Sequence, residues 1–259
     1  MTLEIKLSMI LNIIMTVVLI AVLIPSVKMI IRDRKRFLML FFSMACMCYL
    51  LSSLYWLAYE AIRPGIRMPF AADEIADCSM ILLLSASLET LLRDKKKKVP
   101  GELIFSFLYI SANIFLWIMW SGEWVQDIVF GLPYFYFIWI IIRGIRSSKA
   151  LNKAELIACA LTPFVIIGFQ TANLYAAGNL RNIADLIGYA FMYFFMAWLG
   201  IKSIKSGNIY LRYAFFFWTL IATFSCSGYL YLVAAAANVL AVIVVYMAVR
   251  KETLNHDIR

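Results

Sequence analysis

The residues best suited to chemistry are acids that interrupt long apolar stretches of the chain. Asp73, Glu74 and Asp77 stand near the start of one such stretch, on one broad face of the helix expected there. Asp185 takes a similar place in a later stretch, about one turn after Arg181. Stretches of this length cross a bilayer, where an acid costs at least about 2.5 kcal/mol at the centre and less near the edge. We therefore expect these acids to face the interior of a helix bundle and to find a partner there.

The depth of the two central acids follows from the basic residues that end their stretches. Counting about 20 residues back from Arg93 and from Lys202 marks the outer edge of the hydrocarbon. Asp77 and Asp185 then lie roughly 6 Å inside that edge, at about 1.5 Å of rise per residue. Two carboxylates at the same depth predict an outward-facing polar pocket.

Such a pocket would bind a small polar or cationic solute, and the protein would then move this solute across the membrane. A carboxyl group in the pocket can also carry a proton, so coupling of transport to protons is one form of this hypothesis. The alternative for the same residues is a structural cluster of ion pairs and helix caps that closes the outer end of the bundle. The candidate binding residues lie near the predicted outer ends of three stretches: Asp77, Asp185, Glu74, Asp73, Asn173, Gln170, Arg181 and Asn182.

Two other classes of function stay open. A membrane-embedded enzyme would use Asp77 and Asp185 as general acid and base on a lipid-borne substrate, but nothing in their spacing selects this chemistry. We therefore favour a protein without catalytic activity. A sensor or assembly subunit would act through partners, either a second copy of this chain or another membrane protein. His256, the one histidine, excludes a histidine-based zinc site or serine–histidine triad within the membrane, and we expect no cofactor and no metal.

Other polar residues receive structural interpretations. Asn113 and Asn238 lie within apolar stretches, where hydrogen bonds between helices are worth about 0.6 kcal/mol each. A basic run is expected to set the orientation of the chain and, as a consequence, to contact anionic lipid; it consists of Lys95, Lys96, Lys97 and Lys98.

The composition of the chain that carries these residues is typical of a membrane protein. Of its 259 residues, 64% are hydrophobic and only 15% are charged, and the mean hydropathy is +0.86. A soluble domain is about half apolar and about one quarter charged, so a soluble core could not bury this surface. The composition excludes a disordered chain, a nucleic-acid-binding protein and a secreted disulfide scaffold. The net charge of +9 is then explained by basic loops that set the orientation of the chain in the membrane.

We predict an all-α fold, a polytopic membrane helical bundle of about nine transmembrane helices in a single domain. A helix needs about 20 mostly apolar residues to cross the hydrocarbon. The last two stretches are separated only by a tight turn. The stretches that meet the requirement are Leu7–Ile31, Phe37–Tyr59, Pro69–Leu92, Gly101–Trp120, Trp124–Ile142, Leu151–Ala176, Asn182–Ile201, Ile209–Ser225 and Tyr229–Val249.

The basic residues predict the orientation of the bundle. All but four of the 24 Lys and Arg residues fall on one side of the spans, and positively charged loops face the cytosol. The N-terminus is then outside and the C-terminus cytosolic, which requires an odd number of spans. We expect a multi-pass protein of the plasma (cytoplasmic) membrane.

A short internal repetition predicts two parallel halves. Ile75-Ala76-Asp77 recurs as Ile183-Ala184-Asp185, and Pro25 and Pro133 share the same offset. Parallel repeats with the binding site between them are a known construction of transporters. The alternative is a chance match of a tripeptide. The halves would be residues 7–92 and 124–203, with a linker helix at 101–120 and a terminal helix pair at 209–249.

Overall fold

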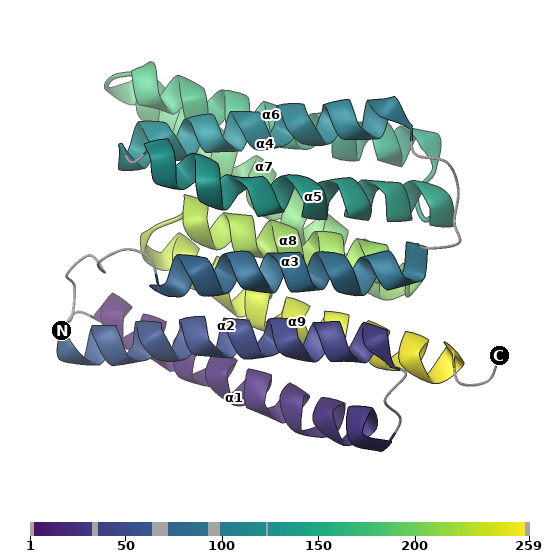
Figure 1. Cartoon of the computed structure of the whole chain (residues 1–259). Helices are drawn as coiled ribbons and strands as arrows, with labels where there is room; N and C mark the ends of the chain where they lie inside the picture. Colours follow the sequence, from purple (N-terminus) through teal and green to yellow (C-terminus); the bar gives the residue numbers. More distant parts are fainter. Residues whose placement is uncertain (1–2, 33–35, 64–71, 93–98, 123, 257–259) are drawn as a thin grey trace. The chain divides into compact units, whose positions relative to one another are not determined.

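The structure, a computed structural model, describes residues 3–32, 36–63, 72–92, 99–122 and 124–256. Over these ranges the chain is helical and contains no strand, which confirms the predicted all-α class (Figure 1). The helices are α1 (Leu3–Arg32), α2 (Phe37–Ile62), α3 (Ala72–Leu92), α4 (Pro100–Ser121), α5 (Trp124–Ser148), α6 (Lys153–Tyr175), α7 (Asn179–Ser206), α8 (Ile209–Ser225) and α9 (Gly228–His256).

Within the described ranges, eight helices are long and apolar enough to cross a membrane. The exception is α8, which has 17 residues. At about 1.5 Å per residue it extends about 25 Å, against roughly 30 Å of hydrocarbon. The chain is therefore a multi-pass membrane helical bundle, and the ninth crossing depends on α8.

The helices begin and end near the predicted bounds, and the differences lie at polar ends. Helix α9 continues to His256, beyond the predicted end at Val249, because residues outside the hydrocarbon can keep the helical hydrogen bonds. Helix α6 starts where Asn152 caps it. The Asn152 side chain accepts from the Glu155 backbone N–H at 2.8 Å, and the Glu155 carboxylate accepts from the Asn152 N–H at 2.9 Å.

The helices belong to two compact units. Unit 1 consists of Met1–Lys95 and Arg212–Arg259, and unit 2 of Lys96–Leu211. Unit 1 therefore joins the first three helices with α9 and most of α8, while unit 2 holds α4 to α7. The internal repeat, whose halves have other bounds, stays a prediction.

In unit 1, α2 packs against both α1 and α3, and α9 packs against α1 and α2. The Tyr213 side chain of α8 is fully buried, and its hydroxyl pairs with the Ser87 hydroxyl of α3 at 3.2 Å. Ser87 itself donates to the Leu38 carbonyl of α2 at 3.2 Å. Arg212 donates to the Val244 carbonyl of α9 at 3.1 Å. These bonds tie α8 into the unit.

In unit 2, α4 packs against α5, α6 packs against α7, and α4 also contacts α6. Glycine allows two close approaches in this unit. A Cβ at Gly131 would lie 2.5 Å from the Ile114 side chain of α4, and one at Gly144 would lie 2.0 Å from the Tyr210 ring. Small residues at such points let helices in a membrane pack closely.

Candidate functional site

A polar cavity of about 150 Å³ lies inside unit 1. Its wall comes from the first halves of α1, α3 and α9 and from the second halves of α2 and α8. These halves meet at one end of the unit, the end that the charge distribution predicts to face outside. The polar residues of the wall are Asn12, Ser52, Ser53, Asp77, Thr223 and Asn238.

Asp77 is the charged residue of this wall. Its side chain leaves α3 about one turn after the helix begins, and its Oδ1 atom is buried without a hydrogen bond. Ser52 of α2 is the hydrogen-bonding neighbour of the carboxyl group. A carboxylate oxygen withdrawn from water is costly unless a donor reaches it. Among the described residues no donor reaches the Asp77 Oδ1 atom.

Asn238 is the second polar group without a partner in the wall. Its side chain is only 1% exposed, and neither its amide nitrogen nor its amide oxygen makes a hydrogen bond. Tyr49 of α2 is the hydrogen-bonding neighbour of this side chain, so the interpretation of Asn238 as an interhelical hydrogen bond stays a prediction. Asn113 bonds within its own helix instead, donating to the Tyr109 carbonyl at 2.9 Å. A side-chain amide such as that of Asn238 has both donors and an acceptor for a ligand.

Aromatic side chains complete the wall around Asp77. Tyr49 and Trp56 come from α2, Phe224 from α8 and Tyr231 from α9. The Tyr49 hydroxyl has Asn238 as its hydrogen-bonding neighbour and interacts electrostatically with Asp77 and Tyr231. The Tyr231 hydroxyl lies against the side chains of α1, where Ser8 and Asn12 are its hydrogen-bonding neighbours.

The other predicted acids of α3 lie outside the cavity wall. Asp73 and Glu74 belong to the first turn of α3, and both are half-buried. Acids in a first turn are stabilised by the positive end of the helix dipole. Their position fits the capping alternative as well as a place at the entrance of a site.

Unit 2 holds the second group of predicted site residues. Asn173 of α6 donates from its amide nitrogen to the Asp185 carboxylate of α7. Arg181 donates from Nε to the Asn173 side-chain oxygen at 3.0 Å. Gln170 is half-buried on α6, and Asn182 is exposed on α7. Three of the five residues thus form a hydrogen-bonded chain between α6 and α7.

Asp77 and Asp185 therefore have separate neighbours. Asp77 belongs to unit 1 and lines its cavity, whereas Asp185 belongs to unit 2 and accepts a bond from Asn173. A pocket shared by the two acids stays a prediction. Sequence reasoning missed Tyr49, Ser52 and Tyr231, because tyrosine and serine are common in membrane helices and carry no spacing signal of their own.

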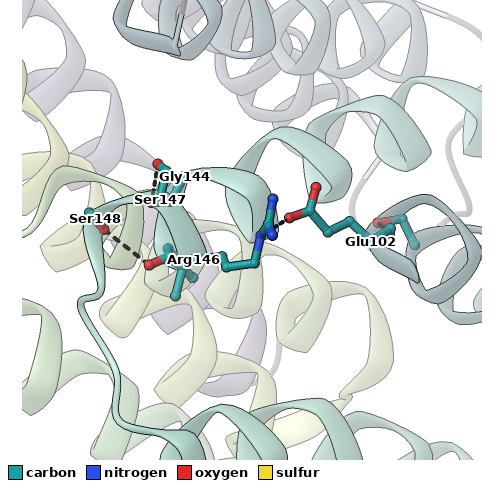
Figure 2. Close-up of polar contacts among 7 residues, drawn as sticks. Glu102, Gly144, Arg146, Ser147 and Ser148 are labelled. Atoms are coloured by element: carbon teal, nitrogen blue, oxygen red, sulfur yellow. Dashed lines mark hydrogen bonds and ion pairs between the residues drawn. The ribbon is translucent and has the colours of Figure 1, made fainter. Parts of the chain in front are cut away.

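Two ion pairs in unit 2 were also not predicted. Arg146 of α5 reaches Glu102 of α4, whose side chain is 5% exposed (Figure 2). Next to this pair, Ser147 and Ser148 donate to the carbonyls of Gly144 and Ile145 at 3.0 and 3.1 Å. The second pair joins Lys202 of α7 to Glu155 of α6. Matching acids and bases across the predicted hairpins would have found both pairs.

Two further predictions concern the basic run and metal binding. Lys95, Lys96, Lys97 and Lys98, predicted to contact anionic lipid, lie outside the described residues. Over the described ranges, no three His, Cys, Asp or Glu side chains gather so that they could hold a metal ion.

A scan against protein-family models finds no matching family, and searches of curated proteins and of solved structures find no match.

Proposed function

We propose that this multi-pass membrane protein binds a small polar or cationic solute in the unit 1 cavity and moves it across the membrane. One observation carries the proposal. The Asp77 Oδ1 atom and the Asn238 amide are both buried, both lack a hydrogen bond, and both belong to the wall of the same cavity. Buried polar groups in native proteins are nearly always paired, so two unpaired groups on one cavity favour a bound polar molecule.

The chemistry of the wall favours a cation among polar solutes. An ionised carboxylate only accepts hydrogen bonds, so a ligand at Asp77 must donate, and a positive charge would also offset the cost of keeping the carboxylate from water. Asn238 can bind either a donor or an acceptor of the same ligand. A neutral polyol could satisfy the hydrogen bonds but not the charge.

The size of the cavity limits the solute. An apolar protein cavity of about 150 Å³ takes up benzene. The unit 1 cavity has about the same volume. A solute with a few heavy atoms fits, whereas a sugar or nucleotide does not.

The site we propose is centred on Asp77 rather than shared equally with Asp185. Asp185 already accepts a hydrogen bond from Asn173, which in turn is bonded to Arg181. This chain supports the structural alternative for Asp185 and its neighbours. Asp73 and Glu74 would line the approach to the cavity from outside.

The membrane setting of the proposal follows from the charges of the chain. We place the protein in the plasma membrane with its C-terminus in the cytosol, so that the cavity lies in the outer half of the bilayer. Contact of the basic loops with anionic lipid, coupling to protons and assembly with a second copy or another membrane protein are parts of the same hypothesis. No structural observation favours the enzyme or the sensor.

Thermal unfolding of the purified protein tests binding. Methylammonium, sodium and glycerol are added in turn to the wild type, to Asp77→Asn and to Asp185→Asn, because a molecule that binds only the folded state raises its stability. We expect at least one of these probes to raise the unfolding temperature of the wild type and of Asp185→Asn but not of Asp77→Asn.

Uptake of radiolabelled methylammonium into vesicles that contain the protein then tests transport. Uptake by the wild type that Asp77→Asn abolishes is the expected result. If the wild type and Asp77→Asn respond alike to all three probes in the unfolding experiment, the proposed function is wrong.

A further inference from the structure

Aromatic rings make up a large part of the wall of the unit 1 cavity, although a solute that is bound only by hydrogen bonds does not need them. Tyr49, Trp56, Phe224 and Tyr231 belong to three helices and all line this one cavity. Asp77 brings the negative charge into the same wall. A carboxylate next to several aromatic rings is a general way to bind an organic ammonium ion, because ring faces attract cations.

We infer that the unit 1 cavity selects an alkylated ammonium ion over an inorganic cation and over a neutral solute of the same shape. This inference rests on the proposed function and names the substrate class of the same site. The carboxylate would meet the charge, and the rings would cover the alkyl groups that surround the nitrogen.

The wall is poorly suited to a divalent inorganic cation. Ions such as Ca²⁺ and Mg²⁺ take oxygen ligands, usually with more than one carboxylate among them. Asp77 is the one acid in the wall as the structure describes it, and no cluster of three acids, histidines or cysteines exists among the described residues. Leu11, Met15 and Leu220 take up further parts of the wall and cannot replace the water of a hydrated ion.

The wall is well suited to an alkylated ammonium ion. Alkyl groups gain from contact with leucine, methionine and aromatic surfaces, while the charge is attracted both by Asp77 and by the ring faces. Tetramethylammonium has fewer heavy atoms than benzene, so it fits a cavity of about 150 Å³.

Two of the four rings, those of Tyr49 and Tyr231, have neighbours that hold them in place before any ligand arrives. The Tyr49 ring packs edge-on against Phe216, with ring centroids 6.2 Å apart. The Tyr231 hydroxyl has Ser8 and Asn12 of α1 as hydrogen-bonding neighbours. A site ordered in advance loses less conformational freedom on binding, which favours a weakly solvated ligand.

Calorimetric titration of the full chain in lipid nanodiscs tests the selectivity. Tetramethylammonium chloride is compared with sodium chloride and with tert-butanol, which has a similar shape without the charge. We expect tetramethylammonium to bind at least about tenfold more tightly than either comparison compound, the difference expected from the charge and the ring contacts together.

Matched tyrosine variants of α9 test the role of the rings. Tyr231 lines the cavity, whereas Tyr229, two residues earlier, is 65% exposed and does not. Tyr231→Leu is expected to weaken tetramethylammonium binding about tenfold, while Tyr229→Leu leaves it within about twofold.

The results separate this inference from the proposed function. Binding of sodium or glycerol that depends on Asp77, without binding of tetramethylammonium, would overturn the inference and leave the function standing. Equal effects of the two leucine variants would also overturn it. If the wild type binds none of these compounds, both the inference and the proposed function fail.

Discussion

At the scale of single residues, two side chains in the wall of the unit 1 cavity, Asp77 and Asn238, have buried polar atoms without a hydrogen bond. Such atoms do not stabilise the fold. Leaving a buried amide unpaired costs about 1–3 kcal/mol. Asn238 pays this cost at both amide atoms, and the Asp77 Oδ1 atom adds to it. Groups of this kind are expected where a binding site is kept ready for a ligand rather than where a core is optimised for stability.

Replacing Asn238 with leucine should therefore stabilise the protein. Leucine has the same branched shape and no polar atom, so we expect the free energy of unfolding to rise by about 1 kcal/mol. Thermal unfolding in detergent measures the change. Asn113→Leu is the matched control, because the Asn113 amide is also buried but donates to the Tyr109 carbonyl, and its removal should bring no gain. A loss of stability for Asn238→Leu would mean that the amide is structural.

At the scale of helices, unit 2 depends on close approach and on ion pairs between neighbours. A Cβ at Gly144 would lie 2.0 Å from Cδ1 of Tyr210, a buried ring atom near the root of its side chain that cannot move freely. The ion pair between Glu102 and Arg146 connects α4 with α5, and the pair between Glu155 and Lys202 connects α6 with α7. Each feature can be tested by itself.

Gly144→Ala should lower the free energy of unfolding by about 1–3 kcal/mol, because the helix or the ring must shift. Gly168 of α6 has nothing within 4 Å of the corresponding Cβ position. Gly168→Ala should therefore raise stability by up to about 1 kcal/mol through helix propensity alone. Chemical denaturation of both variants measures the contrast, and equal effects would show that the contact at Gly144 does not limit packing.

A double-mutant cycle should find coupling between Glu102 and Arg146. The Glu102 side chain is 5% exposed and that of Arg146 is 39% exposed, so we expect a coupling of about 1 kcal/mol, below the value for a fully buried pair. Glu102→Gln, Arg146→Gln and the double variant supply the cycle. The pair between Glu155 and Lys202, which is more accessible at the acid, should show weaker coupling. The reverse order would contradict the burial of Glu102.

At the scale of the whole molecule, the sequence predicts an odd number of membrane crossings. Whether the number is odd depends on whether α8 crosses. Reporter proteins fused at the two ends of the chain measure the orientation. We expect a cytosol-dependent reporter to be active after α9 and inactive before α1, because the basic loops should face the cytosol. The same reporter activity at both ends would mean an even number of crossings, as expected if α8, with its 17 residues, does not cross.

The sequence predicts the helices of this protein well and the inward faces of these helices poorly. The bounds of α8 agree with the prediction because polar residues on both sides mark where this apolar helix begins and ends. In lipid, however, both the buried and the exposed faces of a helix are apolar, so periodicity does not reveal which face lines a cavity. Asp77 could be singled out because an acid in a span is rare. Tyr49, Ser52 and Tyr231 could not, because their place in the wall depends on helix rotation.

Calorimetric titration of methylammonium into the protein in nanodiscs tests the central claim most directly, with the wild type, Asp77→Asn and Asp185→Asn compared at the same protein concentration. The account predicts saturable binding to the wild type and to Asp185→Asn, and a loss of affinity on the order of a hundredfold for Asp77→Asn, as expected when one partner of a buried charge pair is removed. Undiminished binding by Asp77→Asn, or a loss confined to Asp185→Asn, would contradict it.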